Sequence, residues 1–480
     1  MIITRKKWIV IILFDLIMFV ISFFYPDTMI IVLVMILWSN GLIYTLENLE
    51  KRGALFAFLV SFFLILVGRE ALEVFGLHEV EADFTSELNR QAEWMVLMSL
   101  VFLFLGYAIT DKRTFRINKK VDYNYNSSEY ITIRKVSSIL FYLTFAFNIF
   151  TEIDIILFVF RHGYITYYTS FVSSVPYVIK KIGDMCVVCF WIFLATMPDK
   201  KRVNKLSRFY IIYLLLTLAT GKRFPFVAGL LTLFVYYIAR NKINNGGKIW
   251  VKKRTLILLC IFTPLLVMSL YIIGQIRVGS MMDSIRIDKI ISSFLYNQGV
   301  SINVIKRAQL YHDRLPDGKF YLFGSTFEAI ANNVISRQLG FTQFAGNTVE
   351  HALNGVSFQH ALSYVTMGNY YLAGHGLGSC YIAEAFHDLG YFGVAAVNFV
   401  YGIIFRKLFN FKCHGIWGTT IILSMLYSLL LAPRGSADGF ITDIVDLTTW
   451  GTILIVWFFS QMLHSRSYYT LDSSSGSGVQ

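Results

Sequence analysis

Residues 54–68 read ALFAFLVSFFLILVG, an apolar run without a charged side chain. Similar runs recur along the chain and predict about twelve membrane spans, at residues 8–24, 28–46, 54–68, 94–110, 137–158, 183–197, 208–220, 224–239, 255–274, 380–405, 416–432 and 447–463. About twenty apolar residues cross the hydrocarbon layer as a helix, because only helices and closed barrels satisfy their backbone hydrogen bonds there. The sequence therefore predicts an all-α integral membrane protein.

The overall composition supports the same class. The 480 residues are 56% hydrophobic, 16% aromatic and only 15% charged, which is typical of a chain surrounded by membrane lipid. The net charge of +13 is divided into short Lys and Arg runs between apolar segments, so it favours no nucleic-acid partner. The five cysteines lack a second CxxC motif or a histidine at metal-ligand spacing, and we expect neither a metal nor a cofactor.

The distribution of basic residues predicts the orientation. Connections rich in Lys and Arg alternate with connections that are poor in them or acidic; the basic ones are 5–7, 111–120, 199–208, 240–254 and 406–412. Basic connections face the cytoplasm in multi-pass proteins. We therefore predict a bacterial cytoplasmic (inner) membrane protein with both termini in the cytoplasm, and with residues 69–93, 159–182 and 275–379 outside.

The domain prediction is a single polytopic membrane domain over residues 1–465. Residues 275–379 are too long for a simple connection and predict an extracytoplasmic loop subdomain. Apolar residues at Ile287, Ile291, Phe294 and Leu295 recur at helical spacing, which indicates amphipathic helices that could cap a cavity. The polar residues 473–480, SSSGSGVQ, are interpreted as a tail without function.

Basic side chains at the predicted outer ends of spans are the first candidate site. They are Lys222 and Arg223 in TGKRFP, Arg277, Arg434 and Arg69. The planar guanidinium group meets phosphate oxygens through two hydrogen bonds and stays charged when desolvated, so these residues predict a diphosphate site. Two alternatives stay open: Lys222 and Arg223 could reach the lipid headgroups, and Arg69 could form an ordinary ion pair with Glu70 or Glu73.

The second candidate lies in 374–405, GHGLGSCYIAEAFHDLGYFGVAAVNFVYGIIF, which predicts one long helix running from Ser379 towards the cytoplasm. Glu384, His387 and Asp388 would share one face of it. Glu384 is the predicted catalytic residue, since it could accept a proton, pair with an arginine or bind a hydroxyl. His387, Asp388 and His375 are predicted to bind substrate, with a structural role as the alternative for His387.

These residues carry a family resemblance. Residues 376–402 resemble the late motif of bacterial O-antigen and capsule repeat-unit polymerases of the Wzy type. TGKRFPFVAGLLT, residues 220–232, resembles their short basic loop, and VGREALEVFG with the acidic stretch 79–87 resembles the early part of the branch found in capsule loci. The resemblance implies a GT-C-like membrane glycosyltransferase bundle, inverting and metal-independent, and it maps functional arginines onto Arg223, Arg277 and Arg434.

The implied reaction joins polyprenyl-diphosphate-linked oligosaccharides. A hydroxyl of an incoming repeat unit attacks the growing chain and expels polyprenyl diphosphate, with Glu384 as the first choice of general base and His360 as the second. A chain-length regulator and a flippase are the implied partners. An O-antigen ligase shares these features, and a flippase would have a similar length, but a flippase has little need of a long external segment.

Overall fold

The structure is a computed structural model of the chain. It describes residues 5–24, 26–78, 83–113, 124–243, 249–252, 254, 255, 257, 258, 269, 290–411 and 414–475. Every element in these residues is a helix, which confirms the predicted all-α class.

Each predicted span except 255–274 overlaps a helix, and most of 255–274 lies outside the described residues. The helices concerned are α1 (Arg5–Phe23), α2 (Met29–Glu47), α3 (Leu49–Phe62), the π-helical turn η2 (Phe63–Val67), α4 (Gly68–Val74), α5 (Ser86–Arg113), α6 (Ser128–His162), α8 (Tyr177–Ala195), α9 (Lys200–Ala219), α10 (Arg223–Ile243), α19 (Tyr381–Lys407), α20 (Ile416–Leu430) and α22 (Leu447–Ser475). Within the described residues, 6 helices are long and apolar enough to cross a membrane, or 7 if the bent pair of α21 (Gly439–Val445) and α22 forms one span. The membrane class is thus supported, while the number of crossings stays a prediction.

The chain divides into two compact units. The first comprises Met1–Asn118, Leu231–Asn410 and Tyr427–Thr442, and the second comprises Lys119–Leu230, Phe411–Leu426 and Asp443–Gln480. In the second unit α6, α8 and α9 pack together, and α22 lies along α6 and α8. The helix α22 continues to Ser475, into the predicted tail, and residues 476–480 lie outside the described part.

The core of the first unit is the contact between α5 and α19. A Cβ atom added to Gly106 would collide with the carbonyl of Phe399, and one added to Gly402 would collide with the carbonyl of Leu103. Small residues at these crossing points let the two backbones approach closely, as is common between helices in membranes. The close packing fixes α19, which carries several of the candidate site residues.

The prediction of one continuous helix over 380–405 is wrong, because α19 breaks at Gly390. This glycine has φ 60° and ψ −150°, a conformation that side chains disfavour. The rings of Tyr381 and Tyr401 stack 5.2 Å apart, although a straight helix would separate two residues twenty positions apart by about 30 Å. The Tyr381 hydroxyl also donates to Asn398 Oδ1 at 2.7 Å. Residues 381–389 therefore fold back along 391–407, and we call 381–389 the re-entrant arm.

Gly390→Ala is expected to lower the free energy of unfolding by about 1–3 kcal/mol, because alanine is strained in this conformation. No atom lies within 4 Å of the added Cβ, so the effect comes from the backbone alone. Thermal unfolding of the purified protein in detergent measures it, with Gly451→Ala as the control, since Gly451 also has open space but lies inside α22. Equal unfolding temperatures for the two variants would argue against the strained bend.

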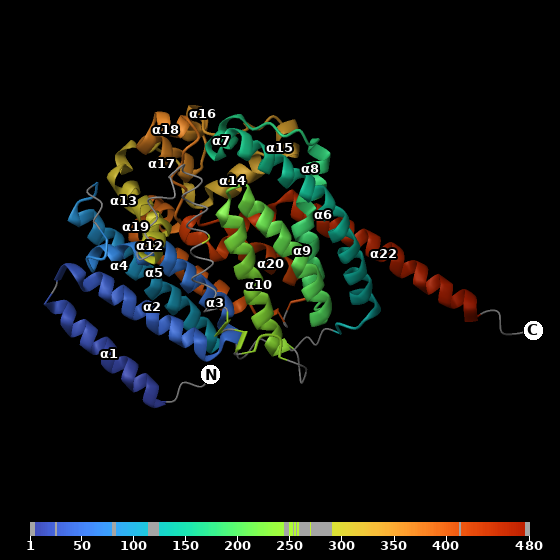
Figure 1. Ribbon diagram of the computed structural model, residues 1–480, viewed down its shortest axis with the longest axis horizontal. Coiled ribbons are helices and arrows are strands. Elements are labelled where there is room, and N and C mark those ends of the chain that lie inside the picture. The colour runs from blue at the N-terminus through green and yellow to red at the C-terminus, as the bar shows by residue number, and fades with distance from the viewer. Residues whose placement is uncertain are drawn as a thin grey trace, which may run out of the picture. The chain divides into compact units, whose positions relative to one another are not determined.

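Residues 290–379 of the predicted external segment fold into short helices. They are α12 (Ile290–Gln298), η6 (Gly299–Ser301), α13 (Ile302–Leu310), η7 (His312–Arg314), η8 (Tyr321–Phe323), α14 (Gly324–Ala331), α15 (Val334–Gln338), α16 (Val349–Asn354), α17 (Phe358–Met367) and α18 (Asn369–Leu372). Figure 1 shows α16, α17 and α18 gathered at one end of the first unit, with α1 at the opposite end. We call residues 290–379 the helical segment; its external position stays a prediction.

Candidate functional site

Glu384 joins the re-entrant arm to the loop that carries Arg434. It is only 2% exposed, and its Oε1 accepts a hydrogen bond from Ser379 Oγ at 2.5 Å. Its Oε2 accepts from the backbone N–H of Ala437 at 2.7 Å. The Tyr401 hydroxyl donates to the carbonyl of Ala437 at 2.8 Å, so both arms of α19 hold this residue. The contacts give Glu384 a positioning role, and its predicted catalytic role stays a prediction.

The other side of the same loop is held by Asp438. This residue is 1% exposed, and its Oδ2 accepts from the backbone N–H of Thr326 in α14 at 2.7 Å. Arg434 ends the 3-10 turn η10 (Ala432–Arg434) and is half-buried. Because residues 437 and 438 are fixed to α19 and to the helical segment, the backbone that carries Arg434 is held from two directions.

His387 and Asp388 meet residues of the helical segment near the bend at Gly390. The rings of His312 and Tyr321 lie 4.9 Å and 5.2 Å from the ring of His387. Asp388 Oδ2 accepts from the backbone N–H of Leu322 at 2.8 Å. We call His312, Tyr321, His387 and Asp388 the outer polar cluster, after the predicted external position of the helical segment. The sequence singled out two of its members, and the structure adds the other two.

Three buried atoms of the outer polar cluster have no hydrogen-bond partner among the described residues. They are the Tyr321 hydroxyl, His387 Nδ1 and Asp388 Oδ1. Burial, and secondly the neighbouring Asp388 carboxylate, raises the pKa of Tyr321 above its usual value, so the phenol stays a neutral donor. Buried polar atoms normally have a hydrogen-bond partner, so three such atoms without one mark this cluster as unusual.

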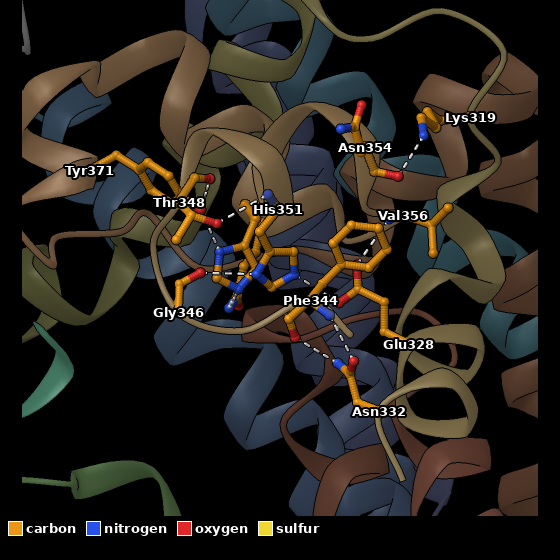
Figure 2. Close-up of polar contacts among 12 residues, drawn as sticks. Lys319, Glu328, Asn332, Phe344, Gly346, Thr348, His351, Asn354, Val356 and Tyr371 are labelled. Atoms are coloured by element: carbon orange, nitrogen blue, oxygen red, sulfur yellow. Dashed lines mark hydrogen bonds and ion pairs between the residues drawn. The ribbon is translucent and has the colours of Figure 1, made fainter. Parts of the chain in front are cut away.

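A second polar group organises the helical segment (Figure 2). His351 Nε2 lies 3.1 Å from Glu328 Oε2, and His351 Nδ1 lies 2.9 Å from the carbonyl of Gly346. Both partners can act as acceptors, an arrangement that favours the protonated ring, in which both nitrogens are donors. Burial alone would lower the pKa of His351, but the hydrogen bonds to Glu328 and Gly346 and the Glu328 charge outweigh it and raise that pKa. Glu328 Oε1 also accepts from the backbone N–H of Val356 at 2.9 Å.

His360, the second predicted base, belongs to this group. Its ring lies 3.7 Å from the ring of His351, and its Nδ1 lies 2.9 Å from the Tyr371 hydroxyl, which donates to the carbonyl of Thr348. Nδ1 therefore carries the ring proton. Burial, and then the charge of His351, lowers the pKa of His360 to about 4, so the ring is neutral at neutral pH. Its role as a base stays a prediction.

His375, the remaining predicted substrate ligand, lies close to the same group. Its ring packs edge-on against Tyr370 at 5.5 Å, and its carbonyl accepts a hydrogen bond from Asn347 Nδ2 at 2.7 Å. The backbone contact anchors the start of 375–380, the stretch that leads into the re-entrant arm. A substrate contact for its side chain stays a prediction.

Arg69 forms the ion pair that the sequence offered as the alternative to phosphate binding. It is 5% exposed, its Nε donates to Glu73 Oε1 at 3.0 Å, and its Nη2 donates to the Tyr296 hydroxyl at 2.7 Å. Glu70 pairs instead with Lys306, at 2.5 Å. These buried contacts join α4 to α12 and α13, which supports a structural role for Arg69.

Lys222 and Arg223 belong to the second unit. Lys222 Nζ donates to the Tyr167 hydroxyl at 2.9 Å, and Gly221, with φ 86°, packs against the ring of Tyr164. Both tyrosines lie in α7 (Tyr164–Ser170), so the turn before α10 is held against that helix. Arg277 lies outside the described residues.

These features define a multi-pass α-helical membrane protein with buried polar groups around a re-entrant arm. The chain belongs to the O-antigen polysaccharide polymerase Wzy family, whose model matches residues 7–467, nearly the full chain. No curated protein and no solved structure gives a significant match. The family acts on lipid-linked oligosaccharide repeat units in membranes, and membership supports a role as a polymerising glycosyltransferase.

Proposed function

We propose that the protein lengthens a polysaccharide on the outer face of a bacterial cytoplasmic membrane. It transfers the growing glycan from polyprenyl diphosphate to a sugar hydroxyl of an incoming lipid-linked repeat unit. The family match over nearly the whole chain carries this proposal. Basic connections alternate with connections that are poor in Lys and Arg or acidic, and this pattern supports the proposed orientation, with the helical segment outside and both termini in the cytoplasm.

The reaction forms one glycosidic bond and breaks one bond to phosphate. The acceptor oxygen bonds to the anomeric carbon of the growing chain from the face opposite the diphosphate, and the configuration inverts. The electron pair of the broken bond leaves with polyprenyl diphosphate. Arg434 would neutralise this developing charge in place of a metal ion, because fixed guanidinium donors stabilise phosphate oxygens well.

The remaining phosphate-binding assignments rest on the sequence. Arg223, Lys222 and Arg277 keep this role in the proposal because each lies at a predicted outer end of a span. Arg69 is the weakest member of the set, since Glu73 and Tyr296 already hold its guanidinium group. A chain-length regulator and a flippase are the proposed partners.

The role of Glu384 can be tested by two substitutions. In Glu384→Gln the amide oxygen can still accept from the Ala437 N–H, and the amide nitrogen can donate to the Ser379 hydroxyl. A positioning role therefore predicts elongation within a few-fold of wild type, whereas a general base would lose about 10²–10⁴ in rate.

Glu384→Leu is the companion variant. It leaves two buried donors without acceptors, and each costs about 1–3 kcal/mol of folding stability. Elongation rates and thermal unfolding of both variants decide between the two roles. A stable Glu384→Gln protein without activity would contradict the positioning role and support Glu384 as the general base.

Cysteine labelling in intact cells tests the orientation. In a cysteine-free background, an impermeant reagent should label a cysteine introduced at Glu350, which is exposed on α16, and should not label one at Asn118. Lysed cells should allow both to react, which controls for reactivity. Labelling at 118 but not at 350 in intact cells would reverse the proposed topology.

The glycan made by cells without this protein tests the function. Loss of a polymerase leaves single repeat units that still cross the membrane and are still attached, so short products replace long chains. Loss of a flippase would instead strand units in the cytoplasmic leaflet, and loss of a ligase would leave long chains on the lipid carrier. Either of the last two patterns would contradict the proposal.

A further inference from the structure

The outer polar cluster combines buried polar atoms that have no hydrogen-bond partner among the described residues with access from the surface. His312 is exposed, His387 and Asp388 are half-buried, and Tyr321 is 1% exposed. The ring of Phe358 lies 5.2 Å from that of Tyr321 and 5.7 Å from that of His387, which gives the cluster an apolar side. The cluster thus reaches from the surface into the core.

The chemistry of the three unpartnered atoms selects the ligand class. The Tyr321 hydroxyl is a donor, Asp388 Oδ1 is an acceptor, and the neutral form of His387 can offer either function at Nδ1. A sugar hydroxyl donates and accepts at once, so it can pair with Asp388 and Tyr321 together. A phosphate only accepts, and the Asp388 carboxylate would repel it. The cluster therefore suits the neutral acceptor sugar rather than the diphosphate.

Asp388 differs from the nearby Glu384 in the hydrogen bonding of its carboxylate oxygens. Glu384 has both oxygens occupied by donors. Asp388 has Oδ2 fixed by the Leu322 N–H, which orients the carboxylate, and Oδ1 has no partner among the described residues. An oriented carboxylate with one oxygen that has no hydrogen-bond partner can accept a proton from a bound hydroxyl.

We propose that the outer polar cluster is the acceptor subsite of the polymerase and that Asp388 is its general base. This inference rests on the proposed function. The proton of the acceptor hydroxyl passes to Asp388 Oδ1 as the oxygen bonds to the anomeric carbon, and the bond from that carbon to the diphosphate breaks with its electron pair. Tyr321 holds the hydroxyl by donating to it, and Asp388 returns its proton to water after release.

The test measures elongation by purified protein in lipid nanodiscs. The substrate is the lipid-linked repeat unit extracted from cells that lack this protein, and initial rates are recorded against its concentration. Asp388→Asn should lower kcat at least about 100-fold and change KM by less than about threefold. Asn keeps a carbonyl acceptor for the Leu322 N–H, so the fold should persist, and Asp388→Glu should recover part of kcat.

A second variant and a control complete the test. Tyr321→Phe removes only the hydroxyl and should raise KM about 3–10-fold with kcat nearly unchanged. Asp317→Asn, an exposed carboxylate in the same helical segment, should match wild type.

The outcomes separate the two proposals. Two results would overturn the inference while wild type elongates. One is a kcat of Asp388→Asn within about threefold of the wild-type kcat. The other is a change of KM in Asp388→Asn without a change of kcat. If Asp388→Asn does not fold, the KM of Tyr321→Phe tests the proposed subsite instead. A KM equal to that of wild type would overturn the proposal. Absence of elongation by folded wild type would contradict the proposed function instead.

Discussion

Arg434→Lys is expected to slow chain elongation by about 10²–10³-fold, the usual effect of removing one preorganised donor from a site of developing charge. Lysine keeps the charge but loses the planar pair of donors that meets two phosphate oxygens. Arg434 lies in a loop whose Ala437 is held by Glu384 and Tyr401, so its backbone should need little rearrangement on binding. Initial rates with the lipid-linked repeat unit measure the effect.

Arg337→Lys is the matched control for this prediction. Arg337 is an exposed arginine in α15 of the same unit, and its replacement should leave the rate unchanged. If the Arg434→Lys and Arg434→Ala proteins are folded and elongate at the wild-type rate, Arg434 does not bind the diphosphate.

Glu328→Ala is expected to open part of the helical segment. The substitution leaves the buried His351 imidazolium without its carboxylate and the Val356 N–H without an acceptor. Breaking a buried ion pair from one side costs about 3–5 kcal/mol. Backbone hydrogen exchange should therefore rise by about 10²-fold or more around residues 346–360.

Glu350→Ala is the control, because Glu350 is exposed on α16, the helix that carries His351. Its exchange rates should equal those of wild type. Equal protection in Glu328→Ala and Glu350→Ala would show that the ion pair does not hold the segment together.

The polar group formed by Glu328, His351 and His360 predicts how the stability of the helical segment depends on pH. The folded pKa of His351 is raised, so its contribution is complete below the unfolded pKa of about 6.5 and is lost as pH rises through the folded value. The folded pKa of His360 is lowered to about 4, so its contribution is complete above about pH 6.5 and is lost as pH falls towards 4. Exchange protection should therefore be greatest near neutral pH, and a steady rise down to pH 4 would contradict the assignment.

The sequence predicted the helices well but missed the bend in α19. Residues 380–405 keep an apolar character throughout, and glycine is common in membrane helices, so Gly390 within LGYFG gives no clear stop signal. The bend depends on the stacking of Tyr381 on Tyr401 and on the bond to Asn398, which are contacts formed only after folding.

The sequence predicts only those contacts of the candidate site that join residues close together in the chain. The pairing of Arg69 with Glu73 follows helical spacing and was one of the two interpretations offered by the sequence. Glu384, His387 and Asp388 were recognised because ionisable residues are rare in apolar segments. Their partners Ala437 and Tyr321 are distant in sequence and carry no local signal, and the same holds for the pairing of His351 with Glu328.

The most direct test of the proposed function is elongation of purified lipid-linked repeat units in the presence of a chelator and without nucleotide sugars. The diphosphate leaving group already supplies the driving force, and arginines rather than a metal are proposed to neutralise its charge. Products of two, three and more repeat units should accumulate on polyprenyl diphosphate. Units that stay single, while a reference polymerase extends its own substrate in the same buffer, would contradict the account.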